Sequence, residues 1–299
     1  MAVRRKKVAA APPTTLLGAH VSAAGGVPEA PARAGELGAS ALQLFTKMAS
    51  RWAERDCADD ECALFRERLA AAGVDAHATM AHDSYLINLA SPDPVLRARS
   101  IVSFTTELRR CHALGLRYLV SHPGNFMDER DSGIARNADA ISESLAAVSG
   151  DTIVCLETTV GSGTSLGSTF EELAAIIGQV DASHRHRIGV CVDTCHVYSA
   201  GYDLITDYEG VLARFDDVLG LDRLKVMHLN DSKTAFGSHR DRHELIAEGS
   251  LGERPFQQVM NDPRLAAIPK VIETPKLDDA TATDTRMLER LRSYVLTGS

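Results

Sequence analysis

The 299-residue sequence has few cysteines, no long apolar run and no excess of basic residues, and each scarcity excludes a class of protein. No stretch approaches the roughly 18 apolar residues of a membrane-spanning helix, so we expect no membrane partner. Six cysteines without a Cys-x-x-Cys pair are too dilute for a disulfide scaffold and indicate reduced thiols of a cytoplasmic protein. The net charge is -8 and apolar residues make up 44% of the chain, which is typical of a folded globular protein.

The first fifteen residues differ in composition from the rest. Four basic residues, Arg4 to Lys7, precede a stretch rich in Ala and Pro, and no apolar segment of secretory length follows them. We therefore expect residues 1–15 to be a basic tail, either solvated or in contact with nucleic acid, and residues 16–299 to be one catalytic domain.

Short apolar runs alternate with longer segments of helical period through the remainder of the chain. Eight such runs occur, at residues 16–20, 41–45, 75–79, 117–121, 152–156, 188–192, 224–228 and 270–273. Strands that alternate with helices predict a parallel sheet, because a parallel crossover needs a dozen or more residues. Eight units without a linker favour an α/β fold with a single (β/α)8 TIM barrel, and a doubly wound open sheet is the alternative.

Helix boundaries are marked in three of the intervening segments. Asp93-Pro94 predicts the start of a helix that ends at Gly115. Ser168 to Glu171 and Thr206 to Glu209 have the spacing of capping boxes.

Polar residues of one chemical kind follow the apolar runs, where the active site of such a barrel lies. Seven of the eight runs lead to a His or a carboxylate, and only the second, which contains Gln43, does not. His20 is the weakest candidate, because its segment is also compatible with a core histidine. Asp241 and His243 follow the seventh run at a spacing that lets both side chains point the same way. The candidate ligands are His82, His122, Glu157, Asp193, His196, His228, Asp241, His243 and Glu273.

Imidazole and carboxylate together are ligands for Zn, Mn or non-haem Fe. One metal needs three or four protein ligands, so nine suffice for two ions, and for three if one carboxylate bridges. Clustered metals of this kind serve phosphate-ester hydrolysis, so the sequence predicts a metal site at the C-terminal face of the barrel.

The segments that carry these ligands resemble the endonuclease IV family of apurinic/apyrimidinic endonucleases from Leu17 to about Pro275. The matching segments are Gly18–Gly26, His82–Leu89, His122–Gly124, Leu156–Thr158, Val192–His196, Ala200–Asp203, Met227–Asp231, Asp241–His243, Glu248–Gly249 and Ile272–Thr274.

The resemblance implies a three-zinc DNA repair enzyme, and Mn2+ is an alternative ion at one site. Recognition of damage by a single barrel gives no reason to expect a dimer, so we expect a monomer. The enzyme would hydrolyse the phosphodiester 5′ to an abasic site in double-stranded DNA, giving a 3′-hydroxyl and a 5′-deoxyribose phosphate, and would remove 3′-blocking groups. The first zinc would be bound by His82 and His122, with catalytic Glu157 bridging it to the second. The second would also have Asp193, His228 and Glu273 as ligands, and the third His196, Asp241 and His243.

The resemblance also implies DNA contacts. Tyr85 and Leu86 match the pair of side chains that fill the gap left by the flipped nucleotide. The family pattern after the second strand is Thr-Lys-Asn-x-Arg-Gln-Trp, whereas this chain has Ser50 at the Arg position and Arg51 one place later. Arg51 is therefore a candidate DNA contact. Three Zn2+ ions would change the net charge from -8 to -2, so phosphate affinity can be local.

Two other functions are compatible with this barrel. A sugar isomerase or epimerase would use one or two metal ions and would not need His196, Asp241 or His243. A DNA-damage binding protein without catalytic activity would bind the lesion and leave the strand intact.

Overall fold

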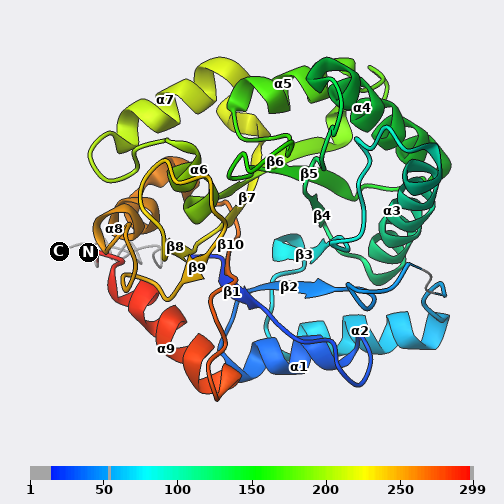
Figure 1. The fold of residues 1–299 in the computed structure, drawn as a ribbon. Coiled ribbons are helices and arrows are strands. Elements are labelled where there is room, and N and C mark those ends of the chain that lie inside the picture. Colours follow the sequence, from blue (N-terminus) through cyan, green and yellow to red (C-terminus); the bar gives the residue numbers. More distant parts are fainter. Residues whose placement is uncertain (1–14, 53–54, 297–299) are drawn as a thin grey trace, which may run out of the picture.

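The structure is a computed structural model that describes residues 15–52 and 55–296. The expected basic tail, residues 1–15, lies outside the described residues apart from Thr15. Eight strands form a closed parallel barrel in the order β1-β10-β7-β6-β5-β4-β3-β2 (Figure 1). They are β1 (Leu17–His20), β2 (Ala41–Phe45), β3 (Thr79–His82), β4 (Tyr118–Ser121), β5 (Ile153–Glu157), β6 (Ile188–Asp193), β7 (Leu224–His228) and β10 (Lys270–Ile272).

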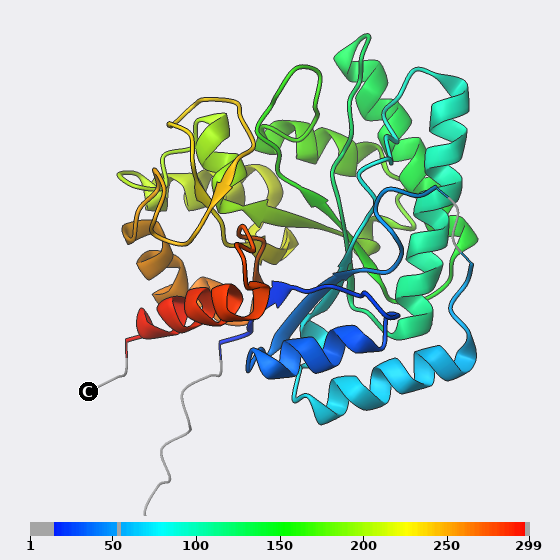
Figure 2. The ribbon, with the colours of Figure 1, turned by 60° about the horizontal axis from the view of Figure 1, so that its bottom comes forward.

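Helices surround the strands, and α9 returns beside β1 to complete the ring (Figures 1 and 2). The α-helices are α1 (Glu29–Glu36), α2 (Asp59–Ala71), α3 (Pro94–Leu114), α4 (Arg130–Ala147), α5 (Phe170–Gln179), α6 (Thr194–Ala200), α7 (Tyr208–Leu219), α8 (Arg254–Asn261) and α9 (Ala280–Ser293). Short 3-10 helices are η1 (Ala76–Ala78), η2 (Arg185–Arg187), η3 (Leu221–Arg223) and η4 (Pro263–Leu265). The (β/α)8 barrel predicted from the sequence is thus confirmed.

Seven of the eight expected strands lie within one residue of their predicted positions, and the third was predicted wrongly. Residues 75–79 were expected to be a strand, but residues 76–78 form η1 because the Asp75 carboxylate accepts a hydrogen bond from the His77 backbone at 2.8 Å. The strand instead begins at Thr79, so His82 is its last residue.

The predicted ends of α3 are confirmed. The Asp93 carboxylate accepts hydrogen bonds from the Val95 and Leu96 backbones, and Gly115 ends the helix in the left-handed conformation at φ 78°. The two capping boxes were wrong in detail. In α5 the N-cap is Thr169, one residue later than expected, and its hydroxyl accepts a hydrogen bond from the Glu172 backbone. The Glu172 carboxylate accepts from the Gly167 and Ser168 backbones rather than from that of Thr169. In α7 Asp207 is the N-cap and makes no capping side-chain hydrogen bond.

Side chains inside the barrel form two layers. The lower layer is apolar and comprises Ala41, Ala78, Met80, Val120, Ile153, Cys155, Cys191, Val226 and Val271. Side chains alternate between the two faces of a strand, so Ile153, Cys155 and Glu157 of β5 all point inward. The upper inward layer, at the C-terminal ends of the strands, is therefore polar.

A two-stranded antiparallel hairpin follows β7 and was not expected from the sequence. It pairs β8 (Asp231–Ser232) with β9 (His243–Glu244). The Asp231 carboxylate accepts hydrogen bonds from the backbones of Gly249 and Leu251, which anchors the hairpin at its base. The loop between the two strands carries Asp241 to the mouth of the barrel.

All six cysteines are free thiols. Among the helices of the described residues, none combines the length and the apolar character that a membrane crossing requires.

Candidate metal centre

Seven barrel strands contribute an inward polar side chain at or just beyond their C-terminal ends, and β2 contributes Gln43 from its middle. Side chains alternate along each strand, so the residue two positions after the last apolar side chain of the lower layer also points into the barrel. In the strands that supply the lower layer, that residue is polar. The inward polar residues are His20, Gln43, His82, His122, Glu157, Asp193, His228 and Glu273. His196, from the first turn of α6, and His243, from β9, join them from above.

Glu157 lies at the centre of this cluster and is fully buried. Its Oε2 atom lies 3.0 Å from Nε2 of both His82 and His122. The other oxygen, Oε1, lies 2.8 Å from Nδ1 of His228 and 3.4 Å from Nδ1 of His196. One carboxylate therefore faces two separate groups of imidazoles, which is the arrangement expected of a bridging ligand.

A second group lies on the His228 side of Glu157. Nδ1 of His228 is 3.3 Å from Oε2 of Glu273 and 3.9 Å from Oδ2 of Asp193. One potential ligand atom from each of Glu157, Asp193, His228 and Glu273 lies within 4.8 Å of the others. Three carboxylates and one imidazole in so small a volume suit a divalent cation.

A third group lies at the mouth of the barrel. Nε2 of His196 and Nε2 of His243 are 3.4 Å apart, and each is 3.3 Å from a different oxygen of Asp241. Asp241 is exposed, whereas His196 is buried, so this group is the one most open to solvent. The structure thus brings together all nine residues predicted as metal ligands. Asp193 lies between the second and third groups, with its Oδ2 3.6 Å from Nε2 of His243.

The outer nitrogens of these imidazoles fix the position of the ring proton. Nδ1 of His196 donates to the backbone carbonyl of Thr158 at 2.8 Å, and Nδ1 of His243 donates to that of Glu273 at 3.2 Å. Carbonyl oxygens only accept, so in the neutral rings both Nε2 atoms carry lone pairs. Two lone pairs 3.4 Å apart cannot bond to each other, and a cation between them satisfies both. Nδ1 of His82 likewise donates to the carbonyl of Asp83 at 2.9 Å.

The buried carboxylates of the cluster need positive charge close to them. Burial alone would lower the pKa of His82, but the Glu157, Glu273 and Asp83 carboxylates raise it to about 10. Burial would raise the pKa of Glu157, but His228 and His122 hold it well below its usual range. Four carboxylates in one partly closed site must be balanced by protonated imidazoles or by metal ions, because buried unpaired charge is costly.

Gln43 is the member of this layer that sequence reasoning missed. It is fully buried, and its side chain lies within hydrogen-bonding distance of His20, His228 and Glu273. The signal was present: Gln43 is two residues beyond the inward Ala41 and is the only polar residue of its run. His20, the weakest metal candidate, lies 3.2 Å from Glu273 and belongs to none of the candidate metal groups among the described residues.

Two thiols lie close to the cluster. Cys191 is near Glu157 and His228, and Cys195 is near Asp241 and His243. Both were expected to be reduced thiols, and both are free. Burial raises the pKa of Cys195 to about 12 and that of Cys191 well above its usual range, which disfavours the thiolate form that binds metals.

The residues predicted to contact DNA lie around the cluster. Tyr85 is 73% exposed in the turn after β3, and its ring lies edge-on 5.3 Å from that of Phe45. Leu86 is half-buried beside it. Arg51 is exposed in the loop after β2, where its backbone carbonyl accepts a hydrogen bond from the buried Lys47 ammonium at 2.5 Å.

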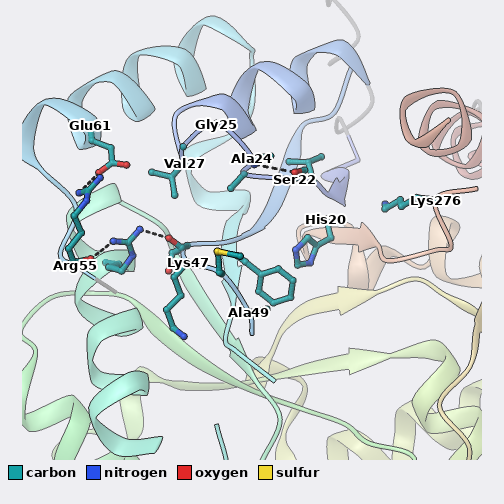
Figure 3. A pocket seen from close by; sticks show the side chains of 17 residues that line it. His20, Ser22, Ala24, Gly25, Val27, Lys47, Ala49, Arg55, Glu61 and Lys276 are labelled. Carbon is teal, nitrogen blue, oxygen red and sulfur yellow. Dashed lines mark hydrogen bonds and ion pairs between the residues drawn. The ribbon is translucent and has the colours of Figure 1, made fainter. Parts of the chain in front are cut away.

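Two hollows adjoin the cluster. The larger, of about 740 Å³, lies between the loops that follow β1 and β2. Figure 3 shows His20 near one end of this hollow and the Arg55–Glu61 ion pair at the other. The smaller, of about 200 Å³, is lined by residues that include His122, His196 and Asp241, so the candidate metal groups are open to a substrate.

The chain is similar to known proteins over most of its length. Residues 31–291 match a protein family described as "Xylose isomerase-like TIM barrel". The chain is 47% identical over 267 residues to "Probable endonuclease 4" of Geobacter sulfurreducens, covering 88% of this chain and 89% of that protein. It is 44% identical to the protein of the same name from Chloroflexus aggregans, covering 93% and 97% of the two chains.

Solved structures give the same result. Endonuclease IV from Thermus thermophilus superposes with a TM-score of 0.81 at 34% identity, covering 93% of this chain and 98% of that one. A D-tagatose 3-epimerase-like protein superposes with a TM-score of 0.67 at 17% identity, covering 93% and 98% of the two chains, and shares the fold alone. From these relationships we conclude that the chain belongs to the endonuclease IV family.

Proposed function

We propose that this protein is a zinc-dependent DNA repair endonuclease that hydrolyses the phosphodiester 5′ to abasic sites, leaving a 3′-hydroxyl and a 5′-deoxyribose phosphate. Removal of 3′-blocking groups is part of the same proposal, because it is also hydrolysis of a phosphate ester at the end of a strand. The observation that carries the proposal is the position of Glu157, whose two oxygens face separate groups of imidazoles. A carboxylate in this position could be shared by two metal ions, and two-metal sites stabilise the attacking and leaving oxygens of phosphodiester hydrolysis.

Three zinc ions would be held by the three groups. His82, His122 and Glu157 would bind the first, and Glu157, Asp193, His228 and Glu273 the second; His196, Asp241 and His243 would bind the third. The paired Nε2 lone pairs and the surplus of carboxylates support this fit. When bound, such ions lower the pKa of water and stabilise the charge that develops on the attacking and leaving oxygens. Mn2+ at one site is compatible with the same ligands.

The protein's own groups position the substrate around this centre. Glu157 is the catalytic residue of the proposal, because its buried carboxylate can orient the attacking water and accept its proton. Backbone carbonyls accept hydrogen bonds from Nδ1 of His82, His196 and His243, so each Nε2 already faces the site and the rings need not turn when the ions bind.

Recognition of the abasic nucleotide is proposed to involve Tyr85, Leu86 and Arg51. Tyr85 is highly exposed yet lies beside the cluster, with its ring 6.1 Å from that of His82, so it can enter a duplex without first leaving a packed core. A missing base lowers the cost of extruding the nucleotide. We also propose that the protein acts as a cytoplasmic monomer, since one barrel supplies every group of the site.

The test is cleavage of a labelled duplex that contains one tetrahydrofuran abasic analogue, with chelated and zinc-restored samples run on a denaturing gel. This analogue cannot undergo β-elimination, so a lyase leaves it intact. A single nick 5′ to the lesion, lost on metal removal and regained with zinc, is expected. An intact strand from folded, zinc-loaded protein would contradict the proposal and turn attention to sugar substrates or to binding without cleavage.

A further inference from the structure

The polar layer of the barrel contains one side chain that cannot ionise and is not a candidate metal ligand. Gln43 points inward from β2 and is fully buried among ionisable groups. A buried amide carries two donors and an acceptor, so its position here has consequences for every neighbour that it contacts.

The orientation of the Gln43 amide follows from its partners. The amide nitrogen lies 2.5 Å from Oε1 of Glu273, and an ionised carboxylate can only accept a hydrogen bond. The same nitrogen lies 3.0 Å from Nδ1 of His20. The amide oxygen therefore points the other way, toward Nε2 of His228 at 2.8 Å.

This orientation determines the tautomer of His228. Because the Gln43 oxygen accepts, Nε2 of His228 must carry the proton and donate. The lone pair of the neutral ring is then on Nδ1, the atom that lies 2.8 Å from Glu157 and 3.3 Å from Glu273. The Gln43 amide thus orients Nδ1 of His228 and Oε2 of Glu273 toward the same small volume.

We propose that Gln43 is a positioning residue for the second metal, setting the tautomer of His228 and the orientation of Glu273 and thereby the affinity for zinc. The inference rests on the proposed function, since it assumes that these residues bind the ion. Partners of this kind commonly change metal affinity by roughly 10- to 100-fold when they are removed. Gln43 would act through two ligands at once, His228 and Glu273.

The test compares the wild-type protein with Gln43→Met, which keeps the length of the side chain and removes its hydrogen bonds to His20, His228 and Glu273. The exposed Gln179 provides the control Gln179→Met, which makes the same chemical change at the end of α5. Zinc content is measured by mass spectrometry during competition with a graded series of chelators, and cleavage of the abasic duplex is measured against free zinc concentration.

Gln43→Met is expected to hold one of the three zinc ions roughly 10- to 100-fold more weakly, and the zinc concentration for half-maximal cleavage should rise by the same factor. Excess zinc should restore cleavage, which it would not do for a defect in packing. Gln179→Met should match the wild type. If Gln43→Met does not fold, as judged by circular dichroism, Gln43→Leu with its smaller side chain takes its place.

Zinc affinity within about twofold of the wild type in a folded Gln43 variant would overturn the inference, because removal of such a partner should cost at least tenfold. Failure of the proposed function is distinguishable, because it is judged on cleavage by the zinc-loaded wild-type protein alone. Zinc retention separates the Gln43 variants from the wild type whether or not DNA is the substrate.

Discussion

Replacing Glu157 with Gln should remove the link between two of the metal groups. The substitution keeps the size of the side chain, but the amide nitrogen that replaces one oxygen can only donate. Whichever way the amide turns, it faces either His82 and His122, both at 3.0 Å, or His228 at 2.8 Å. At least one of these two groups of histidines therefore faces an amide nitrogen in place of a carboxylate oxygen.

The size of the effect follows from burial. Glu157 is fully buried, and removing one member of a buried, hydrogen-bonded charged set costs roughly 3–5 kcal/mol. At about 1.4 kcal/mol per tenfold change, zinc binding at the affected site should weaken roughly 100- to 5000-fold. Cleavage at limiting zinc should fall by at least as much, because the same carboxylate is the proposed base.

The assay pairs zinc content per chain with kcat/KM on the abasic duplex. Glu172→Gln is the matched control, since Glu172 is also buried but accepts hydrogen bonds from the Gly167 and Ser168 backbones at the start of α5. It should lower stability by about 1 kcal/mol and leave zinc content unchanged. A Glu157→Gln protein that retains all its zinc and cleaves at close to the wild-type rate would refute the bridging role.

Three further outcomes are expected. Asp241→Asn should lose one of the proposed zinc ions and roughly 100-fold or more in cleavage, whereas retained activity would favour the two-metal alternative. Tyr85→Ala should leave thermal unfolding unchanged, because the side chain is 73% exposed, and should weaken binding of abasic duplex about 5- to 100-fold in a fluorescence titration. Burial lowers the pKa of Lys270 from 10.5 to about 8, so the folded protein releases this proton at a lower pH than the unfolded chain does. The cost of burying the charged ammonium is therefore fully present below pH 8 and disappears as pH rises to 10.5, and denaturant unfolding should show wild-type stability rising by up to about 3 kcal/mol over that window relative to Lys270→Met.

Most of the barrel could be predicted because each strand is a short apolar run bounded by helical segments. The error at the third strand has a local cause. Residues 75–79 alternate Ala with polar residues, as a strand can, yet the Asp75 carboxylate caps the backbone of His77 and favours a 3-10 turn. A competing side-chain to backbone hydrogen bond of this kind is invisible to a count of apolar residues. The shift of the strand to Thr79 is nevertheless what places His82 at its end.

The hairpin of β8 and β9 could not be predicted from local pattern. Its strands have two residues each, and its anchor is Asp231, which accepts hydrogen bonds from residues 18 and 20 positions later in the chain. The proximity of Asp241 and His243 could be proposed from their spacing. Their convergence on His196 depends on this long-range anchor.

The role of Gln43 in the polar layer was not predicted, for a different reason. Gln43 lies in the middle of its strand rather than at the end, and an amide is not among the usual zinc ligands. The periodicity that places Glu157 and His228 in the barrel also places Gln43 there, one layer above Ala41. A polar side chain that points into the barrel from an apolar strand needs hydrogen-bond partners among its neighbours, whether or not it can bind a metal. In this barrel those neighbours are the candidate ligands, so the constraint that makes Gln43 acceptable in the core is the same one that orients His228 and Glu273.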